Sequence, residues 1–411
     1  MMGKRKSLSI FIIFTLFLCF NFVSCSSSGN STPAAPLKVF TTSATGNGDL
    51  SSWTDANGKT GIAAADAICQ AAASSAGLQG TYKAWISDST TDAYCHIQGY
   101  DGHTISDNCG QTTLPAAAGP WVRTDGFPFG ETINKIINNG VIYAPAAYDE
   151  KGNLIKTYNY DWYFTGTNYD GTKIAQTCSD WTSSDSSDNA YHGETSGTTD
   201  WWSGVSSATC NNAARLLCFQ TGTGVSLPAI TAPTSAKKVF VTSVTGNGNL
   251  TTWADYSGSA TGAAAGDTIC QARATAAGLA NAANFKAWLS DGSHNATDRI
   301  TTDGPWYRLD GVKVADNKAA LLATNSTSTP TPLFTGITYT ETGAYVTADS
   351  YRVWTGTKPD GTEATSDCLD WSNHLNSNTG FVGDAHIAKY WWTSFTPLTC
   401  DQSAALYCFE D

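Results

Sequence analysis

The chain contains two copies of one long segment, and this repetition constrains the fold more than any other feature. Residues 38–50 read KVFTTSATGNGDL and return at 238–250 as KVFVTSVTGNGNL. Further motifs recur in the same order: 68–71 with 269–272, 83–85 with 286–288, 119–121 with 304–306, 165–167 with 355–357, 180–181 with 370–371, and 201–202 with 391–392. The period far exceeds the roughly 50 residues of the longest common solenoid repeats, so we expect two tandem domains.

The matched motifs place the first domain at 37–220 and the second at 237–411. The linker 221–236 is rich in Gly, Pro, Ser and Thr, which is typical of a flexible, partly extended connector.

An Ala-rich helix is predicted over 63–76, because Gly77 follows as a stop signal, and its counterpart over 263–277 ends before Gly278. Residues 39–42 and 82–87 have strand composition, and turn signals punctuate much of the remainder. The pattern predicts the α+β class.

Cysteines are the most specific feature of the repeats. Each repeat contains four corresponding cysteines, and the last three are spaced identically in both copies: Cys69, Cys178, Cys210 and Cys218, and then Cys270, Cys368, Cys400 and Cys408. Four cysteines allow three pairings, and the spacing alone does not choose among them. Cys95 and Cys109 lie in a segment that the second repeat lacks, so the simplest expectation is that they pair with each other. Metal binding is disfavoured because no Cys-x-x-Cys pair occurs.

The N-terminus has the features of an export signal. Lys4, Arg5 and Lys6 precede an apolar run over 10–22, which predicts a signal peptide at 1–24. The ending Phe-Val-Ser-Cys resembles the lipobox of bacterial lipoproteins, which implies that Cys25 carries lipid and that 25–36 is a tether. An ordinary cleavage site followed by a chance cysteine is the alternative. The expected location is the bacterial outer membrane, at the cell surface, with lipid as the only membrane contact.

Charge excludes one class of partner. The chain has 35 acidic and 23 basic residues and a net charge of -12. Nucleic acid is therefore not expected as a partner, because phosphate binding requires a basic face.

Three stretches carry a resemblance to a known family. Residues 65–70 with 76–85, residues 353–361 followed by Cys368 and Trp371, and residues 406–410 resemble the opening, middle and end of endostatin, a module with a C-type-lectin-like fold. The overall pattern is most similar to the endostatin-like lipoproteins of spirochaetes. The resemblance implies two disulfide-stabilised C-type-lectin-like domains.

The same resemblance implies nested disulfides: Cys69–Cys218 around Cys178–Cys210, and Cys270–Cys408 around Cys368–Cys400.

The sequence contains none of three common catalytic motifs, namely the nucleophile elbow, the zinc-protease motif and the P-loop. None of the six histidines is matched between the repeats. We therefore expect no enzymatic activity, no cofactor and no metal. His96 and His103, with Asp101 and Asp107, have the residue types of a metal cluster, although a solvated loop is the favoured interpretation. Structural roles are favoured for the matched carboxylates: Asp66 and Asp267, Asp125 and Asp310, Asp170 and Asp360, and Asp180 and Asp370.

Aromatic residues are the remaining binding candidates. If the pairs Trp201–Trp202 and Trp391–Trp392 lie on strands, one side chain of each faces solvent and is available to a ligand. Burial of both under loops is the alternative. The resemblance implies an adhesin for host extracellular-matrix proteins, plasminogen or complement regulators. A glycan-binding or structural envelope lipoprotein is the second hypothesis, and a hydrolase with converging carboxylates is the third.

Overall fold

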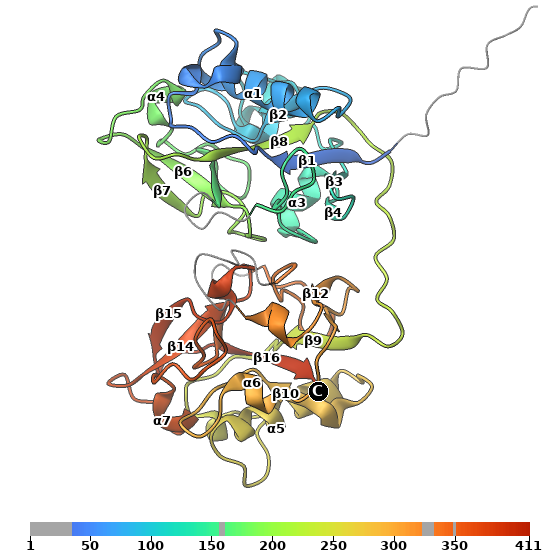
Figure 1. Cartoon of the computed structure of the whole chain (residues 1–411), viewed down its shortest axis with the longest axis vertical. Coiled ribbons are helices and arrows are strands. Elements are labelled where there is room, and N and C mark those ends of the chain that lie inside the picture. Colours follow the sequence, from blue (N-terminus) through green and yellow to red (C-terminus); the bar gives the residue numbers. More distant parts are fainter. Residues whose placement is uncertain (1–34, 156–160, 323–332, 348–350) are drawn as a thin grey trace, which may run out of the picture. The chain divides into compact units, whose positions relative to one another are not determined.

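The two repeats form two sheets with the same strand order. The computed structural model describes residues 35–155, 161–322, 333–347 and 351–411. The predicted signal peptide, Cys25 and most of the tether lie outside these residues. Both sheets have eight strands, in the orders β4-β3-β1-β8-β5-β6-β7 and β12-β11-β9-β16-β13-β14-β15, with β2 and β10 paired to β8 and β16 (Figure 1). The α+β class is therefore confirmed.

The first repeat has the following strands and helices: β1 (Leu37–Thr41), α1 (Gly61–Ser75), β2 (Tyr82–Ala84), α2 (Ala93–His96), β3 (Trp121–Arg123), β4 (Pro128–Gly130), α3 (Ile133–Asn139), β5 (Trp162–Phe164), α4 (Cys178–Trp181), β6 (Asn189–Glu194), β7 (Ser206–Thr209) and β8 (Arg215–Gln220). The second repeat has these: β9 (Lys237–Val241), α5 (Ala263–Ala276), β10 (Phe285–Ala287), α6 (Ala296–Arg299), β11 (Trp306–Tyr307), β12 (Lys313–Ala315), β13 (Arg352–Trp354), α7 (Cys368–Trp371), β14 (Thr379–Asp384), β15 (Thr396–Thr399) and β16 (Ala405–Glu410). The predicted helices agree with α1 and α5 to within two residues at either end.

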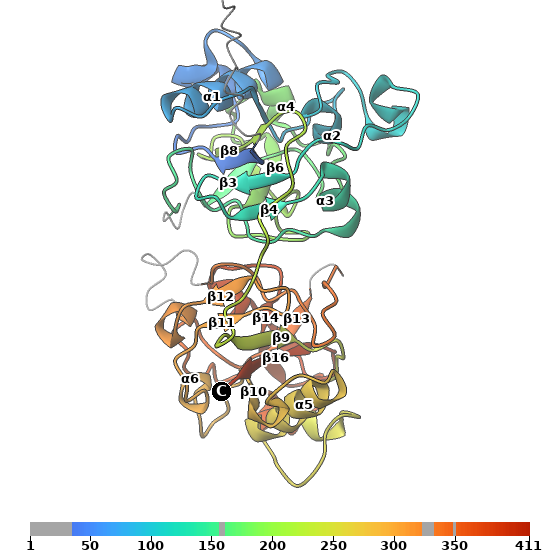
Figure 2. The ribbon, with the colours of Figure 1, turned by 90° about the vertical axis from the view of Figure 1, so that its right-hand side faces the viewer.

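Strand β8 separates two hydrophobic cores. Leu216 and Cys218 point into the core under α1, whereas Leu217 and Phe219 point into the core on the opposite face. Alternate residues of a strand face opposite sides, so the continuous apolar run in β8 reflects burial on both faces. Strand β16 has the same role in the second repeat, where α5 contacts β10 and β16 as α1 contacts β2 and β8 (Figure 2).

The disulfides have the pairing that the resemblance implies. The outer bonds connect the long helix to the central strand, through Cys69–Cys218 in the first repeat and Cys270–Cys408 in the second. The inner bonds and the additional bond of the first repeat are also formed: Cys178–Cys210, Cys368–Cys400 and Cys95–Cys109. All ten disulfide-bonded cysteines are fully buried.

The inner disulfide holds an unusual turn. The φ angles of Cys178, Ser179, Asp180 and Trp181 are 50°, 52°, 54° and 65°, so α4 is a left-handed turn, and α7 repeats this geometry. Left-handed backbone costs roughly 1–2 kcal/mol per residue for side chains other than glycine. The buried ring of Trp181, whose Nε1 donates to the Ser87 carbonyl at 2.7 Å, and the disulfide oppose that cost.

The repeated Gly-Asn-Gly motif has a steric explanation. A Cβ atom on Gly46 would overlap the ring of Trp53, and a Cβ on Gly48 would overlap Sγ of Cys178. Gly246 and Gly248 make the same approaches to Trp253 and Cys368. The motif therefore recurs because the chain passes directly against a tryptophan and a disulfide.

Residues 35–411 form a single unit. Within the described residues, the helices are all too short or too polar to cross a lipid bilayer.

Replacing Gly48 with Ala tests the steric account. We expect Gly48→Ala to reduce the free energy of unfolding by about 2–3 kcal/mol, because overpacking a rigid contact forces the backbone to move. Gly58→Ala is the control, since its φ of 72° is unfavourable for Ala but nothing lies within 4 Å of the added Cβ; the control should cost only about 1 kcal/mol. Denaturant unfolding measures both, and equal losses would contradict the steric explanation.

Candidate functional site

Both tryptophans of the first pair are buried, with Trp201 6% exposed, whereas in the second pair Trp391 is partly exposed. Trp202 and Trp392 are completely buried, each in a hydrophobic core, and therefore cannot touch a ligand directly. Trp201 and Trp391 lie beside each other with their ring centroids 5.5 Å apart. The strand placement is wrong, because Trp201 lies in the turns between β6 and β7 and Trp391 lies in the 3-10 helix η7 (Tyr390–Trp392).

Trp201 and Trp391 line a pocket of about 830 Å³. This volume lies within the range of about 300–1,000 Å³ typical of small-ligand sites. Its walls come from β5, β6 and β7 of the first repeat and from η7 and the residues after it in the second. The lining contains these aromatic and charged side chains: Asp161, Trp162, His192, Glu194, Trp201, Lys389, Tyr390, Trp391 and Phe395.

Backbone hydrogen bonds join the two repeats next to this pocket. Gly197 and Ile387 form an antiparallel bridge. The Thr198 N–H donates to the His386 carbonyl at 2.8 Å, and the Ala388 N–H donates to the Ser196 carbonyl at 2.9 Å. Gly197 precedes Trp201 by the same number of residues as Ile387 precedes Trp391. The bridge therefore pairs equivalent positions, which brings the equivalent tryptophans together.

Three buried charges lie at the pocket wall. Nζ of Lys389 is 2.7 Å from a Glu194 carboxylate oxygen and 3.6 Å from one of Asp161. The same ammonium lies 3.6 Å from the ring centroid of Trp391, a cation–π distance. The side chains of Lys389, Glu194 and Asp161 are 6%, 6% and 8% exposed. Two carboxylates therefore share one cation in a poorly solvated position.

Burial changes the protonation of two groups in the pocket. Burial, together with the nearby charge of Glu194, raises the pKa of Asp161 from 3.8 to about 6, against the opposing effect of Lys389. Because the charged form is disfavoured, the contribution of Asp161 to stability falls as pH rises between these values. Burial and the charge of Lys389 lower the pKa of His192 from 6.5 to about 4. His192 is therefore neutral at neutral pH.

The arrangement is suited to binding a polar ligand between aromatic faces. Trp162, Tyr390, Trp391 and Phe395 are partly exposed. Ionised carboxylates accept hydrogen bonds only, and together they offer more acceptor positions than the three donors of Lys389 can fill.

The matched carboxylates have structural roles. Each accepts a backbone N–H in a turn or at a strand edge: Ala84 to Asp66, Ala287 to Asp267, Phe127 to Asp125, Val312 to Asp310, Thr172 to Asp170, Thr362 to Asp360, Ser89 to Asp180 and Gly292 to Asp370. Asp125 and Asp310 also form ion pairs at 2.7 Å with Arg123 and Arg308.

The expected solvated loop is wrong for His96. Its side chain has no exposed surface and contacts Asp66 and Asp101, whereas His103 is 44% exposed and contacts Asp107. The two histidines therefore belong to different clusters. Within the described part of the chain, no group of three or more His, Cys, Asp or Glu residues is arranged to hold a metal ion.

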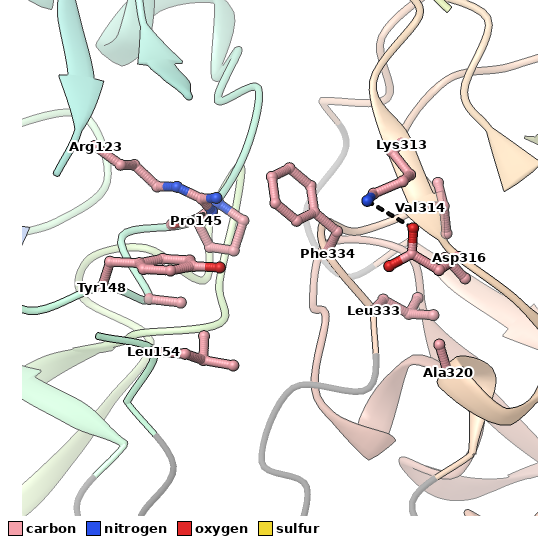
Figure 3. Close-up of a pocket in the computed structure, with 12 residues that line it drawn as sticks. Arg123, Pro145, Tyr148, Leu154, Lys313, Val314, Asp316, Ala320, Leu333 and Phe334 are labelled. Atoms are coloured by element: carbon pink, nitrogen blue, oxygen red, sulfur yellow. Dashed lines mark hydrogen bonds and ion pairs between the residues drawn. The ribbon is translucent and has the colours of Figure 1, made fainter. Parts of the chain in front are cut away.

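A smaller cavity of about 160 Å³ surrounds Arg123 (Figure 3). The guanidinium lies 4.4 Å from the ring centroid of Tyr148 and 4.5 Å from that of Phe334. It also donates to Asp125 and to the Pro145 carbonyl. Arg123 thus makes internal contacts through all three guanidinium nitrogens, and this cavity is below the usual volume of a ligand site.

Comparisons with known proteins give no match: no protein-family model fits the chain, and no curated protein is significantly similar to it. The case for a function therefore rests on the pocket.

Sequence reasoning missed most of the pocket because its residues differ between the repeats. Trp162 occupies the position of Arg352, and Lys389 occupies the position of Thr199. A search for matched residues passes over such positions. The available signal was the clustering of aromatic residues at 390–395, which adds Tyr390 and Phe395 to the pair Trp391–Trp392.

Removing Lys389 tests the buried charge cluster. We expect Lys389→Met to reduce the free energy of unfolding at pH 7 by about 3 kcal/mol or more, because it leaves buried carboxylates without a partner. The loss should shrink near pH 4.5, where Asp161, with a pKa of about 6, is protonated. Thermal unfolding across this pH range measures both effects.

Lys135→Met is the matched control, because Lys135 forms an ion pair with Glu131 at the surface, with side chains 56% and 39% exposed. It should cost less than about 1 kcal/mol. A pH-independent loss for Lys389→Met, or equal losses for the two variants, would contradict the role assigned to the cluster.

Proposed function

We propose that the chain is an extracytoplasmic binding protein of bacteria, built from two endostatin-like repeats of the C-type-lectin-like class, and that its pocket binds carbohydrate. The single observation that carries the proposal is the pocket of about 830 Å³ in which partly exposed aromatic rings face two buried carboxylates. Aromatic faces stack on the apolar faces of sugar rings, and carboxylates accept hydrogen bonds from sugar hydroxyls.

Charge favours a neutral polyhydroxy ligand over a cation. The ammonium of Lys389 already lies against the face of Trp391 and between Asp161 and Glu194. A cationic ligand entering the same position would meet like-charge repulsion in a poorly solvated environment. An anionic ligand would be repelled by the carboxylates. A sugar adds hydroxyl donors without adding charge.

Binding is favoured over catalysis because both carboxylates of the pocket are paired with Lys389. A hydrolase requires one carboxylate that is free to transfer a proton and a second that acts as base or nucleophile. Here both Asp161 and Glu194 are held by Lys389.

A lipid anchor at Cys25 would place the pocket outside the cytoplasm, at the outer membrane. Host extracellular-matrix proteins, plasminogen and complement regulators remain predicted ligands. Such proteins are glycosylated, so a carbohydrate pocket provides one physical route to recognising them.

A glycan array followed by calorimetry of the purified protein tests the proposal. For any glycan that is bound, Trp162→Ala and Trp391→Ala should each weaken affinity roughly tenfold or more, because each removes a stacking surface worth more than about 1.4 kcal/mol. Tyr169→Ala is the control, because Tyr169 is a 40% exposed aromatic outside the pocket lining. It should leave affinity unchanged.

Failure to bind any glycan, or equal affinity of the pocket variants and the wild type, would refute the carbohydrate proposal. A second arm compares native and enzymatically deglycosylated laminin, fibronectin, plasminogen and factor H in solid-phase assays. Saturable binding that survives deglycosylation and the pocket substitutions would support an adhesin that recognises protein surfaces instead.

A further inference from the structure

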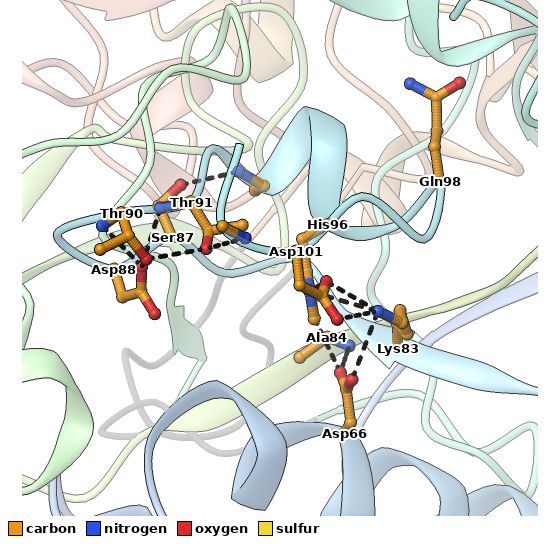
Figure 4. A network of polar contacts seen from close by, with 12 residues as sticks. Asp66, Lys83, Ala84, Ser87, Asp88, Thr90, Thr91, His96, Gln98 and Asp101 are labelled. Carbon is orange, nitrogen blue, oxygen red and sulfur yellow. Dashed lines mark hydrogen bonds and ion pairs between the residues drawn. The ribbon is translucent and has the colours of Figure 1, made fainter. Parts of the chain in front are cut away.

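A buried histidine in the first repeat connects two carboxylates. His96 is the last residue of α2 and its side chain has no exposed surface. Its Nδ1 lies 2.6 Å from a carboxylate oxygen of Asp101, and its Nε2 lies 2.9 Å from one of Asp66 (Figure 4). Lys83 completes the cluster, with its Nζ 2.9 Å from Asp101 and 3.8 Å from Asp66.

The geometry favours the charged form of His96. A carboxylate accepts hydrogen bonds, and a neutral imidazole has one N–H donor and one acceptor nitrogen. Both ring nitrogens face carboxylates, so both contacts are hydrogen bonds only when the ring is the imidazolium. Burial and the charge of Lys83 lower the pKa of His96, but the hydrogen bonds with Asp101 and Asp66 outweigh them and raise it above 6.5. The hydrogen bond with His96 likewise lowers the pKa of Asp101.

The two carboxylates differ in how firmly they are held. Asp66 belongs to α1 and also accepts the backbone N–H of Ala84 at 3.0 Å. Asp101 is 59% exposed and lies between Gly99 and Gly102, whose φ angles are 90° and 76°. If one contact is lost, Asp101 is therefore the group that can move.

Asp101 lies in the segment that the second repeat lacks. This segment continues through the left-handed residues around Cys109 and is closed by the disulfide Cys95–Cys109. The imidazolium and the ammonium of Lys83 both join Asp101 to Asp66 on α1, and of these two cations only the imidazolium titrates near neutral pH.

The second repeat places a permanent cation at the position of His96, although this cation contacts one carboxylate rather than two. Arg299, the last residue of α6, occupies the place of His96 and donates to Asp267 at 2.6 Å and to the Ala263 carbonyl at 3.0 Å. Lys286 pairs with Asp411 at 2.6 Å, as Lys83 pairs with Asp101. Arginine does not lose its proton in proteins. The cation beside the matched aspartate is thus titratable in the first repeat and permanent in the second.

We propose that His96 is a pH-operated latch that fastens the loop carrying Asp101 to helix α1, and that Arg299 makes the corresponding junction of the second repeat insensitive to pH. The charged groups that face the imidazole are Asp66 on α1, Lys83 on β2 and Asp101 on the loop. When His96 loses its proton, the partly exposed Asp66 and the exposed Asp101 share a single cation, Lys83, whose Nζ also lies 3.5 Å from Nδ1 of His96. One of the two hydrogen bonds from the ring to a carboxylate is then lost.

The direction of the effect follows from linkage. The folded pKa lies above the unfolded value, so the stabilisation is fully present below pH 6.5 and is lost as pH rises through the folded pKa. The latch is therefore closed in acidic surroundings and released in alkaline ones.

Histidine NMR and thermal unfolding of the full protein test the latch. The His96 imidazole, assigned as the signal absent from His96→Arg, should titrate with a midpoint above 6.5. His96→Arg should melt higher than the wild type by a margin that grows between pH 6 and pH 9, by roughly 3 °C for a repeat of this size. Arg299→His should create the opposite trend by transferring pH sensitivity to the second repeat.

His96→Gln keeps the test decisive if arginine does not fit, because glutamine is neutral throughout. It should be much less stable than the wild type at pH 6 and should approach the wild type at pH 9. Differences in melting temperature that stay constant across this range, or a His96 midpoint at or below 6.5, would overturn the proposal. Neither outcome depends on the carbohydrate pocket.

Discussion

Burial of one strand on both faces is the constraint on which the rest of each repeat depends. Strand β8 is antiparallel to β1 and β2 and parallel to β5. Its alternate residues enter two cores, and Cys218 ties it covalently to α1. Because β8 lies near the end of the repeat and α1 near its start, neither core is complete until the chain returns. The outer disulfide closes this long-range contact, which loop entropy opposes most strongly.

The helices and strands that could be predicted from the sequence are those whose ends or composition are recognisable from neighbouring residues. Gly77 and Gly278 mark the ends of α1 and α5, and the strand composition of 39–42 and 82–87 marks β1 and β2. The disulfide pairing required the resemblance, because spacing allowed three arrangements. The left-handed turn at 178–181 was not predictable, because its residues have no preference for positive φ and only the surrounding contacts impose it. The Gly-Asn-Gly motif indicated a turn, but its steric cause involves Cys178, far along the chain.

Comparison of the two repeats identifies the structural framework but not the candidate site. Matching the repeats identifies residues that both copies need, and these proved to be core tryptophans, turn carboxylates and disulfides. The pocket is built where the copies differ, with Trp162, Lys389 and Phe395 each lacking an equivalent side chain in the other repeat. Two identical surfaces joined through equivalent positions would form a symmetric contact. Divergence on either side of the Gly197–Ile387 bridge converts such a contact into an asymmetric pocket.

The repeats also differ in the cation that lies beside a matched aspartate, which is His96 in the first repeat and Arg299 in the second. Both repeats need a positive group beside the aspartate that caps their second strand, because Asp66 and Asp267 are held next to the backbone of β2 and β10. Arginine supplies that charge at every pH, whereas histidine supplies it only below its pKa. A histidine is therefore an inferior choice if stability alone matters. Its presence only in the repeat that carries the additional disulfide-closed loop makes the attachment of that loop to α1 respond to pH, whereas the corresponding junction of the second repeat does not.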